Sequence, residues 1–229
     1  MLQKAGGVAA MVEATAYIVG IAIMLTVMAP LSADSVSAVP KLTLTLENKI
    51  LYQVWMLFIY VLFGVALVVL AVALHERLKR VAPSLMQIAT PFGLIWAGMV
   101  IASGMISNVG LNMAASVFAR DPGAAAALWQ SVNAIHDGIG GAVEVVGGLW
   151  LLLLSWAAMR GDELPSPLNY LGLLVGVAGV LTVIPGLSAL GMLFGLGQIV
   201  WFLWLGAVLL RTKQPSGTVV AELQFKHPD

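Results

Sequence analysis

The sequence predicts an all-α fold, a polytopic bundle of six transmembrane helices, and its composition and apolar pattern support this prediction. Of the 229 residues, 60% are hydrophobic and only 10% are charged. A soluble domain carries about 25% charged residues and about 45–50% apolar residues, so a soluble fold of this length could not bury so much apolar surface. The apolar residues also gather into six runs close to the roughly 20 residues that cross a bilayer.

The six predicted helices belong to one domain, residues 1–213, and residues 214–229 form a polar cytoplasmic tail. The helices run over about 6–31, 50–74, 85–108, 134–157, 170–187 and 190–210. The pattern of the third allows the helix to continue to Phe118. Between the first two helices, Leu42, Leu44 and Leu46 alternate with threonines. This period of two predicts a short extended segment on the membrane surface.

Basic residues are distributed unevenly among the predicted loops, and this sets the orientation. With the N-terminus inside, the inner segments hold 8 of the 11 basic residues: Lys4, Arg77, Lys79, Arg80, Arg160, Arg211, Lys213 and Lys226. The outer loops hold the other 3: Lys41, Lys49 and Arg120. Cytoplasmic loops of membrane proteins carry an excess of Lys and Arg. The sequence therefore predicts a protein of the bacterial plasma (inner) membrane with both termini inside.

The composition excludes several classes of chemistry. The chain has no cysteine, which removes disulfides, thiolate catalysis and iron–sulfur clusters. Its formal net charge is zero, so nothing favours a nucleic-acid partner. We find no nucleotide-binding loop, nucleophile elbow or zinc-protease helix. We expect no cofactor and no metal, because His136 and Asp137 are adjacent and point about 100° apart on a helix.

Three acidic residues lie inside predicted spans: Glu13, Asp137 and Glu144. An Asp at the centre of a membrane helix costs about 2.5–3.5 kcal/mol on insertion scales. No Lys or Arg lies within a predicted span to pair with these acids. The cost of placing these acids in the membrane must therefore be offset by hydrogen bonds, water, a proton, a cation or a ligand. For Glu13, two turns from the inner boundary, a lone acid hydrogen-bonded near the surface is the simplest interpretation.

Polar residues of the third and fourth predicted helices form two stripes. Asp137 and Glu144 are seven apart and share a face, with Asn133 one turn further out. Asn108 and Asn112 are four apart on the third helix. A tight outer turn makes the two helices an antiparallel hairpin, so both stripes fall in the outer half and can face each other. The sequence predicts a ligand-binding cavity there, lined by Asn108, Asn112, Asn133, His136 and Asp137, with Glu144 deeper.

Three functions fit these residues, and the sequence leaves them open. In the first, the cavity binds or transports a small polar or cationic solute or protons. In the second, the polar residues only join helices, in a non-catalytic accessory or structural subunit of a membrane complex. In the third, a membrane enzyme acts on a lipid-like substrate with His136 and Asp137 as an acid/base pair. The lipid bilayer is the expected partner, and a homo-oligomer or a complex partner is open.

Several stretches resemble a family of bacterial six-helix membrane proteins that carries only the label of a domain of unknown function. The similar stretches are Lys4 to Gly7, Ala71 to Leu78, His136 to Gly138 with the Gly-rich helix that follows, and Arg160 to Pro167 leading into Leu171 to Gly176. The similarity extends over about residues 4–210. The resemblance implies a fold and a topology. It carries over no catalytic residue, because the family has no settled activity.

Overall fold

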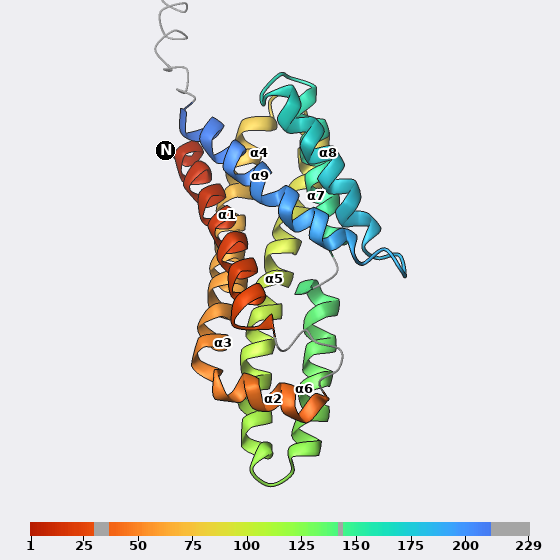
Figure 1. Cartoon of the computed structure of the whole chain (residues 1–229). Coiled ribbons are helices and arrows are strands. Elements are labelled where there is room, and N and C mark those ends of the chain that lie inside the picture. The colour runs from red at the N-terminus through yellow and green to blue at the C-terminus, as the bar shows by residue number, and fades with distance from the viewer. Residues whose placement is uncertain (30–36, 142–143, 212–229) are drawn as a thin grey trace, which may run out of the picture.

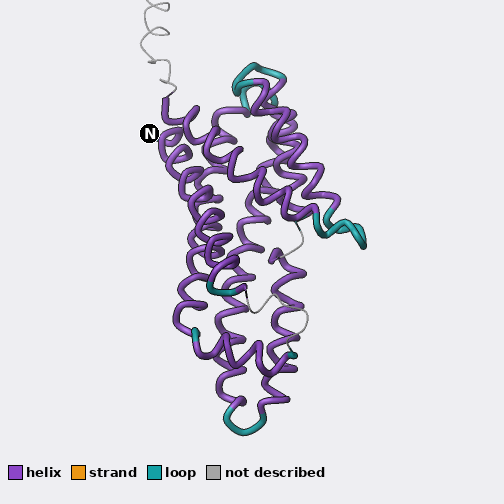
Figure 2. The backbone as a smooth tube through the Cα atoms, in the orientation of Figure 1, coloured by secondary structure: helices purple, strands orange, loops and turns teal. Residues whose placement is uncertain are grey.

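The computed structural model describes residues 1–29, 37–141 and 144–211, and within them the chain is helical without strands (Figures 1 and 2). The predicted all-α fold is confirmed. The predicted tail and the end of the first predicted helix lie outside the described residues. The elements are α1 (Leu2–Thr26), α2 (Ala38–Glu47), α3 (Lys49–Met56), the π-helical segment η2 (Leu57–Leu62), α4 (Phe63–Leu78), α5 (Pro83–Phe118), α6 (Pro122–His136), the π-helical segment η3 (Asp137–Gly141), α7 (Val145–Met159), α8 (Ser166–Leu181) and α9 (Leu190–Arg211).

Five helical stretches are long and apolar enough to cross a membrane. They are Leu2–Thr26, Lys49–Leu78, Pro83–Phe118, Pro122–Met159 and Leu190–Arg211. The protein is therefore a multi-pass membrane protein. The helix α8 has only 16 residues, about 24 Å at 1.5 Å per residue, against a hydrocarbon thickness of about 30 Å. A sixth crossing thus stays a prediction.

The fourth predicted helix is broken, which corrects the prediction of one continuous helix over 134–157. The helix α6 ends at His136, the η3 segment follows, and α7 begins at Val145. Within η3, Gly140 has a φ of 151°, a conformation that L side chains rarely adopt. Glycines at this point therefore permit the break, and Asp137 and Glu144 do not lie on one regular helix face.

Gly140→Ala is expected to lower the free energy of unfolding by about 1–2 kcal/mol, because alanine is strained at this positive φ. A Cβ at Gly140 would lie no closer than 3.9 Å to its neighbours, so the expected loss comes from backbone conformation alone. Gly138→Ala is the control, since a Cβ there meets nothing within 4 Å. Denaturation of the detergent-solubilised protein measures both, and equal midpoints for the two variants would contradict the account.

The hairpin of α8 and α9 reaches only to the level of this break. The backbone N–H of Glu144 donates to Thr182 Oγ1 at 3.0 Å, at the end of α8. Figure 1 shows the turn between α8 and α9 about halfway along the molecule, level with the gap between α6 and α7. One half of the bundle is therefore built from α1, α2, α3, η2, α5 and α6 without α8 and α9.

The extended segment predicted around Leu42 is wrong, because these residues form α2. The helix lies across the end of the bundle beside α6 (Figure 1). Leu42 and Thr45 are buried, a spacing of three that fits a helix better than the apparent alternation. The Thr43 and Thr45 hydroxyls donate to carbonyls four residues earlier, Val39 O at 3.0 Å and Lys41 O at 2.9 Å.

Both chain ends of the described bundle lie at the end opposite α2. Gln3 Nε2 donates to Leu209 O at 3.0 Å, which joins the start of α1 to the end of α9. Arg77 Nε lies 3.3 Å from Glu163 Oε2, which joins the α4–α5 and α7–α8 connections at the same end. Among the described basic residues, Lys4, Arg77, Lys79, Arg80, Arg160 and Arg211 belong to these segments, whereas Lys41, Lys49 and Arg120 belong to the other end.

Candidate functional site

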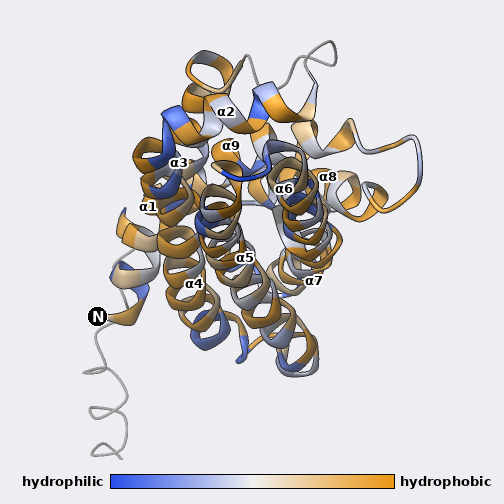
Figure 3. Cartoon of the chain, turned by 90° about the horizontal axis from the view of Figure 1, so that it is seen from below, coloured by the Kyte–Doolittle hydropathy of each residue, from blue (hydrophilic) through white to orange (hydrophobic). Residues whose placement is uncertain are grey.

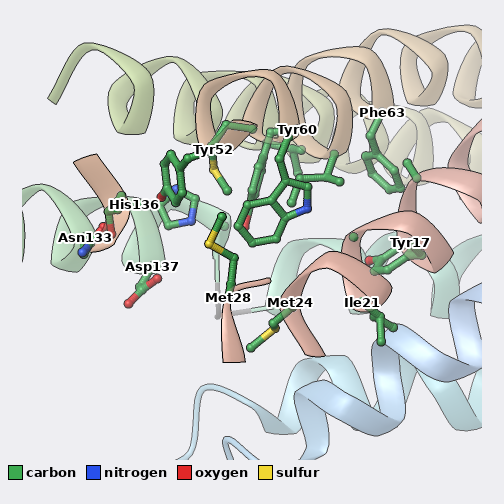
Figure 4. Close-up of a pocket in the computed structure, with 18 of the residues that line it drawn as sticks. Tyr17, Ile21, Met24, Met28, Tyr52, Tyr60, Phe63, Asn133, His136 and Asp137 are labelled. Carbon is green, nitrogen blue, oxygen red and sulfur yellow. The ribbon is translucent and has the colours of Figure 1, made fainter. Parts of the chain in front are cut away.

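A cavity of about 580 Å³ extends from the α2 end of the bundle to the level of α9. There, Tyr17 and Phe63 of the lining contact Phe202, and Trp96 contacts Phe194. Residues of α1, α2, α3, η2, α4, α5, α6 and η3 line it, and Glu144 lines it directly before α7. The close-up in Figure 4 shows α1 on one side, with Tyr17, Ile21 and Met24, and α6 on the other. Figure 3, seen from the α2 end, shows hydrophilic segments among the ends of helices whose sides are mainly hydrophobic.

The lining combines charged, amide and aromatic side chains. Its charged residues are Lys41, Asp137 and Glu144, which give a formal charge of +1 − 2 = −1 with histidine neutral. The amides are Gln130 and Asn133. The aromatic side chains are Tyr17, Tyr52, Trp55, Tyr60, Phe63, Trp96 and Trp129. A space of this size and mixture is typical of a site for a small organic molecule.

Four of the six predicted site residues line the cavity: Asn133, His136, Asp137 and Glu144. They come from α6, η3 and the residue before α7, so the break at η3 bends the predicted stripe around the cavity. Asn133 is half-buried and Asp137 is exposed at the cavity, whereas His136 is buried. The structure thus brings these four residues to one space, and their role as ligands stays a prediction.

Asn108 and Asn112 are absent from the lining and contact α3 instead. Asn108 Nδ2 donates to Gln53 O at 3.2 Å, and Gln53 Nε2 donates to Asn108 O at 3.4 Å and to Asn112 Oδ1 at 3.3 Å. Gly110 of α5 packs against Val132 of α6, so this side of α5 faces α6. Asn108 is two residues away, about 200° around the helix, and so faces away from α6. The predicted meeting of the two stripes is therefore wrong.

Hydrogen bonds with Ser103 of α5 fix the tautomer of His136. Ser103 Oγ donates to the His136 carbonyl at 2.9 Å and lies 2.7 Å from His136 Nδ1. The same ring nitrogen lies 3.2 Å from the Ser103 carbonyl oxygen, which can only accept. This geometry makes His136 Nδ1 the donor, and Nε2 is an acceptor in that tautomer.

Two tyrosines and a second serine complete this wall of the cavity. The Tyr52 hydroxyl lies 2.9 Å from Ser107 Oγ, one helical turn beyond Ser103. The Tyr60 ring packs edge-on against His136, with 4.8 Å between the ring centroids. Sequence reasoning missed these residues and Lys41. The spacing of Ser103 and Ser107, four apart on α5, was the signal available for the serines.

Glu144 lies at the inner end of the cavity, immediately before α7. It is half-buried, and among the described residues no ion pair reaches it. Tyr17 and Tyr60 line the same cavity. The lining cation, Lys41, belongs to α2, at the opposite end of the cavity from α7. The inner part of the cavity is therefore acidic and aromatic, an environment that favours a cation.

A metal site has no support in the described part of the chain, where no group of three or more His, Asp or Glu side chains is placed to hold an ion. The acceptors that line the cavity are spread over α6, η3 and the start of α7 rather than converging. This arrangement can surround an organic cation, which needs fewer directed bonds than a metal ion does.

These features define a class of protein: a multi-pass helical membrane protein with a polar cavity in its bundle. The chain belongs to the family of the domain of unknown function DUF4386, whose members match residues 46–208. This confirms the resemblance inferred from the sequence, although the stretch Lys4 to Gly7 lies outside the matched region. No curated protein and no solved structure matches the chain.

Proposed function

We propose that the protein binds a small organic cation in the cavity, and that this cavity opens to the outer face of the bacterial plasma membrane. The observation that carries the proposal is the pair of carboxylates, Asp137 and Glu144, in an aromatic-walled cavity of about 580 Å³. Acidic groups at membrane depth are costly. A bound cation would compensate them, which gives the two residues a function beyond packing.

The charge distribution supports the proposed orientation. Of the nine described basic residues, six belong to the end that holds both chain ends, whereas Lys41, Lys49 and Arg120 belong to the α2 end. The excess of Lys and Arg marks the cytoplasmic side. The α2 end, and with it the cavity, then faces outward, and both termini are cytoplasmic.

The side chains favour a cation that also carries a hydrogen-bond donor. Tyrosine and tryptophan faces attract ammonium groups, and desolvation strengthens the attraction. His136 Nε2, left as an acceptor by the bonds to Ser103, can accept from an O–H or N–H of the ligand. Gln130 and Asn133 add polar contacts on the same helix. The break at η3 beside the cavity also resembles the discontinuous helices of transporters, which supports translocation as a further step.

An accessory role in a membrane complex is the second candidate function. The amide contacts of Gln53 with Asn108 and Asn112 join α3 to α5 and require no ligand. Such polar seams commonly hold membrane helices together. Under this alternative the cavity residues would tolerate substitution, and a partner protein would co-purify with the chain.

Choline is the first probe of the proposed binding, because it combines a quaternary ammonium with a hydroxyl donor. We expect a saturable change in tryptophan fluorescence when choline is added to the purified protein, since Trp55, Trp96 and Trp129 line the cavity. Tetramethylammonium, which lacks the hydroxyl, is expected to bind more weakly. Sodium chloride at equal ionic strength is the control. A response to choline no larger than the response to sodium would contradict the proposal.

A further inference from the structure

Glu13 of α1 is a second buried acid, outside the cavity lining. Its side chain is 0% exposed, and neither carboxylate oxygen has a hydrogen-bond partner among the described residues. The structure thus corrects the interpretation of Glu13 as an acid hydrogen-bonded near the surface. An unpaired buried carboxylate is very unfavourable, so Glu13 at this position is a neutral, protonated acid.

The elements packed against Glu13 offer no charge to pair with it. The helix α1 packs against α4, α9 and η2. Neither α4 from 63 to 74 nor α9 from 190 to 210 contains a titratable side chain, and η2 presents only Tyr60. On α9, the Gln198 side chain is also 0% exposed and has no partner among the described residues. Glu13 therefore has no structural counter-charge, and packing does not explain its presence.

Tyr17 links Glu13 to the cavity. It lies four residues after Glu13, one turn along the same face of α1, and it lines the cavity. Glu144 lines the same cavity, and Figure 4 shows Tyr17 on the α1 side of it. In the other direction from Glu13, Gly6 and Gly7 pack closely against α4 and α9 near the inner end. Glu13 thus lies between the cavity and the inner end of the bundle.

The groups around Glu144 leave it dependent on a cation or a proton. The titratable residues that line the same cavity include Tyr17 of α1, Tyr60 of η2, His136 of α6 and Asp137 of η3. Thr182, directly after α8, accepts a hydrogen bond from the Glu144 backbone N–H. The helix α5 contains no titratable residue from 83 to 118. No described lysine or arginine is paired with the Glu144 carboxylate. Either a bound cation or a proton can therefore neutralise it.

We infer that Glu13 is an internal proton site that supplies the proton to Glu144 when the cation leaves, an inference that rests on the proposed cation binding. Among the described residues neither Glu13 oxygen is hydrogen-bonded, so the Glu13 and Tyr17 side chains first turn toward each other. Glu13 then gives its proton to the Tyr17 hydroxyl oxygen, and the hydroxyl passes its own proton to the Glu144 carboxylate. The cation, no longer paired, leaves to the outer side. The Glu13 carboxylate then takes one proton from the inner side. One inner proton thus replaces one bound cation, and no other reactant is needed.

The experiment uses the full chain in sealed vesicles, with choline added only outside. Only molecules whose cavity faces outward then bind it, and tryptophan fluorescence reports the affinity. Lowering the pH inside the vesicles by one unit is expected to weaken choline binding by up to about tenfold in the wild type, the limit for one proton competing with one cation. Glu13→Gln is expected to keep the affinity at equal pH and to lose this response.

The control is Glu47→Gln, an exposed acid of α2 outside the cavity lining, which should retain the full response. Tyr17→Phe removes only the hydroxyl and should also abolish the response, which keeps the inference testable if Glu13→Gln does not fold. A full response to the inner pH in either variant would overturn the inference and leave the proposed function standing. The same holds if the wild type binds choline but its affinity does not respond to the inner pH. Absence of choline binding in the wild type would overturn the proposed function and the inference together.

Discussion

Glu144→Gln is expected to weaken choline binding by about 10–100-fold. The substitution keeps the size of the side chain and removes the charge at the acidic inner end of the cavity. Interactions with a charged group contribute about 1.5–3 kcal/mol, and each 1.4 kcal/mol changes an affinity tenfold. Asp137 is exposed, so solvent screens its charge more, and Asp137→Asn should have a smaller effect. Fluorescence titration of the purified variants measures both.

The fold is expected to survive Glu144→Gln, because the hydrogen bonds that the described structure shows for this residue are made by its backbone. Its N–H donates to Thr182 Oγ1, and its carbonyl accepts from Gly148 N. The thermal midpoint should therefore stay within about 2 °C of the wild type, or rise, because a buried charge is removed. An affinity within twofold of the wild type would contradict cation binding by Glu144 and favour the accessory role.

Gly148→Ala is expected to lower the free energy of unfolding by about 2–3 kcal/mol. Gly148 lies where α7 crosses α8. A Cβ there would lie 2.6 Å from Val180 N and 2.7 Å from Gly176 O, so the obstacle is backbone that cannot rotate away. The two helices must therefore move apart. This movement also shifts Glu144, which lines the cavity directly before α7.

Thermal unfolding in detergent, followed by circular dichroism, measures this loss. Gly98→Ala is the matched control, because it is a glycine inside the membrane helix α5 at which a Cβ meets nothing within 4 Å. Gly98→Ala should leave the midpoint unchanged or raise it slightly, since alanine favours the helix. Similar midpoints for Gly148→Ala and Gly98→Ala would contradict the close α7–α8 packing.

Much of the helical fold was predictable from the sequence because long apolar runs admit few alternatives in a membrane. The predicted continuation of the third helix to Phe118 agrees with the end of α5. The break at η3 was not predicted, since an apolar, Gly-rich run can either continue as helix or break. The α2 helix was missed because alternating Leu and Thr suits a strand by pattern alone.

The site residues that lie on one segment of the chain could be predicted from the sequence. The residues on another helix could not, because the sequence does not show which side of that helix faces the site. Asn133, His136, Asp137 and Glu144 are close in sequence and line one cavity. The direction in which Asn108 faces depends on which side of α5 packs against α6. Gly110 lies on the side that packs, because it leaves room for the Val132 side chain. The apolar periodicity does not show which of several small residues on α5 contacts α6.

Cysteine accessibility tests the central claim, an outward-open hydrated cavity, most directly, because the chain has no cysteine of its own. Asn133→Cys and Asp137→Cys place a thiol in the cavity lining. Val109→Cys, an exposed apolar position on α5, is the lipid-facing control. A membrane-impermeant thiol reagent added to intact cells should label the first two and spare the third, and choline should slow the labelling. Folded protein that leaves both cavity positions unlabelled would contradict the account.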